Sequence, residues 1–113
     1  MPSQPTAPVA LDKAYALAQW LIAKIVTIPR AHRFILGDRI YSHSLDLVTA
    51  LTHATFSRHK SRALETASDR VNSLRILLRL AKDTRLLSFD SYTYATGFLD
   101  EIGRMIGGWR KSQ

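Results

Sequence analysis

Apolar and small residues recur along this chain in steps of three and four, the spacing that places side chains on one face of an α-helix. The clearest run lies between residues 64 and 87, where the recurring positions are Leu64, Ala67, Val71, Leu74, Leu78 and Ala81. Because the steps alternate regularly, the run predicts a long helix that starts near residue 61, reaches residue 86 or 87, and packs an apolar seam against partner helices.

Three other segments repeat the pattern and predict three more helices. The first covers residues 11–28 and stops at Pro29, the second covers about residues 34–56, and the last follows Ser88, a natural N-cap. Their seams are Ala14, Ala18, Leu21, Ile25 and Ile28, then Ile40, Ser44, Leu47, Leu51 and Ala54, then Tyr92, Ala95, Leu99, Ile102, Ile106 and Trp109. Four such helices with short connections predict an all-α protein, an antiparallel up-down-up-down four-helix bundle.

A chain of 113 residues is expected to form one domain. We assign residues 11–111 to the bundle. The first ten residues contain Pro2, Pro5 and Pro8, and proline removes a backbone donor and disfavours helix in the residue before it. We therefore expect residues 1–10 to be a disordered, proline-rich tail.

The formal net charge is +7, and the sequence pI is near 10.3. A charge of this size on a small domain indicates an anionic partner: nucleic acid first, then an anionic membrane surface or an acidic protein. The sequence has no run of 18 apolar residues, so we expect no membrane span. It also lacks cysteine and a secretory signal pattern, which is typical of a cytoplasmic protein.

The positive charge is concentrated between Arg58 and Arg85, where eight Lys and Arg residues stand against three carboxylates. Arg75, Arg79 and Lys82 follow one another at i, i+4 and i+7, which predicts one basic flank on the helix. A polyanion would relieve the repulsion between them by releasing counterions, and the alternative is an ordinary solvated face. The candidate contacts are Arg58, Lys60, Arg62, Arg70, Arg75, Arg79, Lys82, Arg85, Arg110 and Lys111.

Several large apolar residues exceed what one core needs, and contiguous exposed patches of such residues mark interfaces. We therefore expect a homo-oligomer, with an interface that contains Trp20, Leu77, Leu80, Met105 and Trp109. The glycines at 37, 103 and 107 suggest close approach by another backbone, although the pair at 107 and 108 could instead end the last helix.

No motif for catalysis or cofactor binding is present. The four histidines include no i, i+4 pair suited to zinc, and there is no nucleotide-binding glycine loop and no nucleophile motif. We therefore expect a protein that is not an enzyme, with no catalytic residue, metal or cofactor.

Three stretches carry a resemblance to a known family: HRFILGDRI from His32 to Ile40, LLRLAKDTRLLS from Leu77 to Ser88, and EIGRMIGGW from Glu101 to Trp109. Together they resemble the accessory variability protein of diversity-generating retroelements. This family belongs to a wider group of bacterial four-helix bundles that includes proteins encoded in ribosomal RNA intervening sequences. The resemblance runs from about residue 13 to residue 111.

The resemblance implies a basic four-helix bundle that assembles as a homopentameric barrel and binds both nucleic acid and the retroelement's reverse transcriptase. That complex copies a template RNA into cDNA with errors at adenines, and the accessory protein has no known catalytic role. Arg79, Lys82 and Arg85 match the family pattern and carry over as candidate contacts to RNA or to the enzyme, whereas Arg33 and Arg39 suggest a structural role.

A specific hypothesis concerns four of these residues, which we call the stripe: Arg75, Arg79, Lys82 and Arg85. We expect the stripe to be repeated around the oligomer, where the copies form one phosphate-binding surface. Two other readings stay open. One is a stand-alone RNA-associated or rRNA-associated four-helix bundle, and the other is a protein-interaction module that uses its charge to bind an acidic partner.

Overall fold

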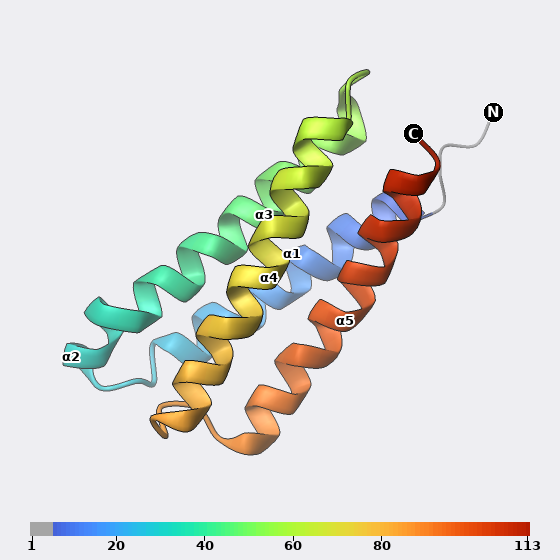
Figure 1. Cartoon of the computed structure of the whole chain (residues 1–113). Helices are drawn as coiled ribbons and strands as arrows, with labels where there is room; N and C mark the ends of the chain where they lie inside the picture. Colours follow the sequence, from blue (N-terminus) through green and yellow to red (C-terminus); the bar gives the residue numbers. More distant parts are fainter. Residues whose placement is uncertain (1–5) are drawn as a thin grey trace.

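The computed structural model describes residues 6–113, and all of the regular secondary structure in that range is helical (Figure 1). The helical elements are α1 (Thr6–Ile25), α2 (Arg30–His32), η1 (Arg33–Gly37), α3 (Asp38–Phe56), α4 (Ser61–Asp83) and α5 (Phe89–Lys111). The short α2 and η1 lead directly into α3, so the chain forms four long rods. The prediction of an all-α four-helix bundle is confirmed.

The four long helices form a ring in cross-section. Both α1 and α4 pack against α3 and α5, while the pairs α1–α4 and α3–α5 lie diagonally. The bundle measures about 48 × 22 × 19 Å. The α3–α4 connection lies at the same end of the rod as the start of α1 and the end of α5, and the other two connections lie at the opposite end (Figure 1).

The seams that the sequence predicts become the core of the bundle. The seam residues Leu21, Leu47, Leu74 and Leu99, one from each long helix, are at most 1% exposed, and Leu17, which no predicted seam includes, is also completely buried. Every predicted seam residue is buried except Tyr92, which is half-buried. Because each large apolar side chain contributes roughly 1.5–3 kcal/mol on burial, these seams account for most of the favourable free energy of folding.

The first helix begins earlier than the sequence predicts. It starts at Thr6, so residues 6–10, which we expected in the disordered tail, form its first turns, and Ala10 is buried in the core. Pro8 is compatible with this position because the first backbone N–H groups of a helix have no partner within it. Residues 1–5 lie outside the described part, and for them the disordered tail stays a prediction.

The second long helix is preceded by a π-helical turn at Arg33–Gly37. A π turn widens the helix and shifts the register of the residues around it. Leu36 is buried there, whereas Phe34 and Ile35 are 71% and 74% exposed. At Gly37 the close neighbour is a side chain rather than another backbone: a Cβ at this position would lie 3.0 Å from Cγ2 of Ile25.

The helix α4 ends at Asp83, three or four residues before the predicted end. Arg85 has a φ of 62°, a left-handed conformation that reverses the chain. The backbone N–H of Leu86 then donates to the carbonyl of Ala81 at 2.8 Å, which closes the helix end in the manner of a C-capping turn. Arg85 therefore lies beyond the helix rather than on its surface stripe.

The start of α5 confirms Ser88 as its N-cap, because the Ser88 hydroxyl accepts a hydrogen bond from the N–H of Ser91 at 3.1 Å. The glycines further along differ from one another. A Cβ at Gly103 would lie 3.3 Å from Nη2 of Arg75, but a Cβ at Gly107 would meet nothing within 4 Å. Close approach at Gly107 was therefore wrongly predicted, and α5 continues past it to Lys111.

Candidate nucleic-acid interface

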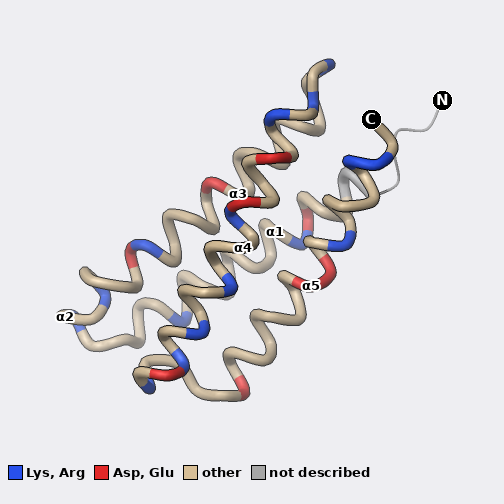
Figure 2. The backbone as a smooth tube through the Cα atoms, in the orientation of Figure 1, with Lys and Arg blue, Asp and Glu red and all other residues tan. Residues whose placement is uncertain are grey.

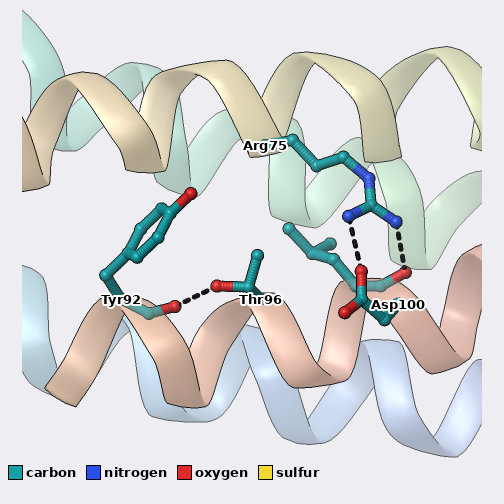
Figure 3. A network of polar contacts seen from close by, with 5 residues as sticks. Arg75, Tyr92, Thr96 and Asp100 are labelled. Atoms are coloured by element: carbon teal, nitrogen blue, oxygen red, sulfur yellow. Dashed lines mark hydrogen bonds and ion pairs between the residues drawn. The ribbon is translucent and has the colours of Figure 1, made fainter. Parts of the chain in front are cut away.

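Arg75, on the predicted basic flank of α4, points toward α5 and pairs with Asp100 there (Figure 3). Nη1 of Arg75 donates to Oδ1 of Asp100 at 2.6 Å, and Nη2 donates to the carbonyl of Leu99 at 3.3 Å. Arg75 thus connects two helices. Two of its N–H groups are engaged in contacts to α5, so Arg75 is less available to a phosphate than an unpaired arginine is.

The next two members of the stripe share one carboxylate. Nε of Arg79 lies 3.8 Å and Nζ of Lys82 lies 3.3 Å from the carboxylate oxygens of Asp83. Lys82 also lies over the ring of Tyr92, with Nζ 4.7 Å from its centroid, and the Tyr92 carbonyl accepts a hydrogen bond from the Thr96 hydroxyl (Figure 3). Both pairs are exposed, so they are weak, but they still reduce the local positive charge.

The charge of the stripe is therefore partly paired, and its role in phosphate binding stays a prediction. Arg75 is paired across helices, Arg79 and Lys82 share Asp83, and Arg85 lies past the end of α4. A further candidate, Arg70, is paired with Asp46 of α3 at 3.2 Å. The Arg75 and Arg70 pairs join residues 25 and 24 positions apart, so a count of charges along one helix does not detect these two.

The remaining candidates gather at one end of the rod (Figure 2). Arg58, Arg62, Arg110 and Lys111 are exposed, and none of them forms an ion pair with another described residue. No Asp or Glu occurs in residues 57–62 or 108–113. We call these four residues and Lys60 the basic end.

Lys60 holds the two parts of the basic end together. Its Nζ donates to the carbonyls of Ala54 at 2.6 Å and Ser57 at 2.8 Å, and it lies 5.8 Å from the ring centroid of Trp109. The α3–α4 connection is thereby fixed beside the last turns of α5. The Lys60 ammonium is thus engaged by groups within the fold, whereas the side chains of the other four residues are exposed to solvent: Arg58, Arg62, Arg110 and Lys111.

A groove of about 580 Å³ runs between α3 and α4 beside the basic end. Two of its lining residues, Ala50 and Ala63, are small, which leaves space between the two helices. The Asp46–Arg70 ion pair also lines it. The polar lining residues are Asp46, Thr49, His53, Ser57, His59, Arg62, Thr66 and Arg70. We call this hollow the α3–α4 groove.

A second hollow of about 400 Å³ adjoins the α3–α4 groove, with which it shares Thr49, His53 and Ser57. It contains Phe56, the last residue of α3, whose side chain is 80% exposed. The sequence reading missed Phe56 and His53 as functional candidates. The available signal was an aromatic residue off the apolar seam, directly before the basic stretch SRHKS.

Of the residues predicted at an oligomer interface, Trp109 was assigned wrongly. It is 1% exposed and belongs to the core. Trp20 and Met105 are half-buried against the core, and the Trp20 ring lies 5.1 Å from that of Tyr94. Leu77 is half-buried and Leu80 is 48% exposed, so these two remain accessible.

Leu77 and Leu80 belong to an apolar hollow of about 440 Å³, which we call the η1 groove. Ile35, Leu86, His32 and Arg39 also line it.

A second apolar surface lies on the outside of α1. Tyr15, Ile22 and Val26 are 58%, 38% and 57% exposed, and their spacing of seven and four residues places them on one side of the helix. We call it the α1 face.

Within residues 6–113, no three His, Asp or Glu side chains come together in a way that could hold a metal ion. None of the described helices is long and apolar enough to cross a membrane. The fold and the charge define a class, the small basic all-α four-helix bundle without a recognised membrane helix.

Residues 9–113 match the family model described as bAvd-like. Because this match covers nearly the whole chain, the protein belongs to the bAvd-like family, that of the accessory variability protein of diversity-generating retroelements. The resemblance inferred from the three motifs is thereby confirmed. No curated protein and no solved structure matched the chain.

Proposed function

We propose that this protein is a non-catalytic accessory protein that binds nucleic acid and partners a retroelement reverse transcriptase in mutagenic cDNA synthesis from template RNA. Membership of the bAvd-like family supports the accessory role. The observation that carries nucleic-acid binding is the basic end, where four exposed cations lack carboxylate partners among the described residues. We expect the reaction to take place in the cytoplasm and the enzyme partner to supply all the chemistry.

The basic end suits phosphate binding without sequence selection. Arg and Lys bind phosphate oxygens, and such contacts position a nucleic acid without reading its bases. Four free cations per copy would release counterions on binding, so affinity should fall steeply as salt rises. In an oligomer the same surface is repeated, and avidity then increases affinity without any additional kind of contact.

We also propose that the copies assemble into a homo-oligomer, a pentamer if the chain follows the family pattern. The η1 groove and the α1 face support this proposal, because both expose apolar side chains that the single bundle leaves uncovered. The two surfaces differ, and contact between two different surfaces generates a head-to-tail ring when the rotation closes.

The test of nucleic-acid binding is fluorescence anisotropy with a labelled template RNA at several salt concentrations, followed by pull-down with the reverse transcriptase. We expect tight binding at low salt, a steep linear fall of log K with log salt, and co-purification of the enzyme. Absence of RNA binding at low salt would contradict the proposal. Enzyme capture without RNA binding would favour the second candidate, a protein-interaction module that uses its charge to bind an acidic partner.

The test of assembly is the molar mass in solution. Light scattering should give a multiple of 12.7 kDa, and Ile35→Asp with Leu80→Asp should reduce it to the monomer mass, because a charge cannot be buried there without a partner. Phe89→Asp is the matched control, since Phe89 is 69% exposed and lies outside both surfaces. A monomeric wild-type protein at micromolar concentration would overturn the assembly proposal.

A further inference from the structure

We propose that the C-terminal end of α3 is a site for single-stranded RNA, in which a phosphate occupies the α3–α4 groove and a neighbouring base stacks on Phe56. This inference rests on the function proposed above and names the part of the molecule that recognises the strand. Two independent observations support it: an exposed aromatic ring and an adjoining groove lined by cationic and neutral hydrogen-bond donors.

Phe56 has the position of a stacking platform. It closes α3, its side chain is 80% exposed, and Arg58 follows two residues later in a connection that contains no carboxylate. An exposed ring of this size gives the single bundle no burial energy. Aromatic rings beside cations are the arrangement on which successive bases of a single strand stack.

The α3–α4 groove supplies donors for a phosphate. Arg62, His53 and His59 line it, and the hydroxyls of Thr49, Ser57 and Thr66 add neutral donors. The other charged residues in the lining are Asp46 and Arg70, which pair with each other and largely cancel. Lys60 and Arg58 belong to the connection above the groove, and Lys60 is occupied by two backbone carbonyls.

His53 joins the two halves of the site. It lines both the α3–α4 groove and the hollow that contains Phe56, so a phosphate and a stacked base would lie on either side of one imidazole.

A single strand fits this arrangement better than a duplex does. In a duplex each base is already stacked and paired, and its faces are not available to an aromatic side chain, whereas unstacked bases of a single strand are. The comparable ring at the opposite end, Phe34, is 71% exposed, and the hollow beside it is lined by Arg30 and Arg33 as well as by the carboxylate of Asp38, but by no serine, threonine or histidine.

The first experiment compares the affinity of Phe56 variants for a labelled single-stranded RNA and for a duplex of the same length. We expect Phe56→Leu to weaken single-strand binding about tenfold and duplex binding hardly at all, and Phe56→Trp to retain or improve binding. Phe34→Leu is the matched control and should leave both affinities unchanged. Equal affinity of wild type and Phe56→Leu for the single strand would overturn the inference.

The second experiment tests the groove by substitution at constant pH. His53→Ala with His59→Ala should weaken single-strand binding by about tenfold, because both side chains line the groove and could donate to the phosphate. The control His32→Ala, at the other end of the rod, should keep the wild-type affinity. A double variant with unchanged affinity would contradict the groove assignment.

The outcomes separate this inference from the proposed function. If wild type binds no RNA, the proposed function fails. If wild type binds RNA but shows no preference for the single strand and no effect of Phe56→Leu, only the site assignment fails. A change in oligomer mass with Phe56→Leu would place Phe56 in contact with a second copy instead, and would also overturn the site.

Discussion

The basic end holds Arg58, Lys60, Arg62, Arg110 and Lys111 without a carboxylate, whereas at the other end of the rod Asp38, Asp83 and Asp90 lie among the cations (Figure 2). The surfaces differ as well. The far end carries the apolar η1 groove, and the basic end carries the α3–α4 groove with its histidines and hydroxyls.

The comparison teaches that pairing, rather than the number of cations, decides which surface remains available to an anion. Arg79 and Lys82 stand one residue or one turn from Asp83, and their charge is partly neutralised. Arg58 and Arg62 belong to the same stretch of sequence, but neither forms an ion pair with another described residue, although Glu65 follows Arg62 by three residues. The two ends are therefore expected to bind different partners.

The largest effect on the free energy of unfolding is expected from substitution of Trp109, whose ring lies beneath Lys60 of the basic end. Trp109→Ala should lower the free energy of unfolding by about 3–5 kcal/mol, because it leaves a cavity in the core and removes the ring beneath Lys60. Chemical denaturation measures this change. Trp20→Ala, at a half-buried position, is the comparison and should cost clearly less; equal costs would contradict the placement of Trp109 in the core.

A smaller effect on the free energy of unfolding is expected from Gly→Ala substitutions near the two ends of the rod, at Gly107 and at Gly37. Gly107→Ala should raise the free energy of unfolding by up to about 1 kcal/mol, because alanine is the better helix former and its Cβ meets open space. Gly37→Ala should gain less or lose stability, since its Cβ would lie 3.0 Å from Ile25. Thermal unfolding of both variants decides the sign, and an equal gain at Gly37 would contradict the close packing of η1 on α1.

The smallest effect concerns the left-handed residue at the far end. Arg85→Gly should stabilise the protein by roughly 0.5–1 kcal/mol, because glycine adopts a φ of 62° without steric cost. We expect RNA affinity to change less than threefold, since Arg85 lies outside the basic end. Denaturation and anisotropy on the same sample measure both quantities, and a large loss of RNA affinity would return Arg85 to the candidate contacts.

Much of the fold could be predicted from the sequence because its determinants are local. The periodic seams identified the four long helices and almost every core residue, and Ser88 marked the start of α5. The start of α1 was missed because the first turn tolerates Pro8. The π turn was missed because the apolar pattern does not reveal a local change of helical pitch, and that turn coincides with the exposed Phe34 and Ile35.

The candidate site was predicted less well because its determinants are long-range. The sequence identified the right residue types and included Arg58, Arg62, Arg110 and Lys111 among ten candidates. It could not show that Arg75 reaches Asp100 on another helix, or that the α3–α4 connection lies beside the end of α5. Charge pairing and the meeting of distant segments depend on the packing of the bundle.

The most direct test of the central claim is the salt dependence of RNA binding for three proteins. These are the wild type, a variant with Arg58, Arg62, Arg110 and Lys111 all changed to Ala, and a variant with Arg79→Ala and Lys82→Ala. The first variant should lose on the order of a hundredfold in affinity at low salt and reduce the single-strand slope by about 3, while the second should stay close to wild type. The reverse result, a loss confined to the Arg79 and Lys82 variant, would contradict the account.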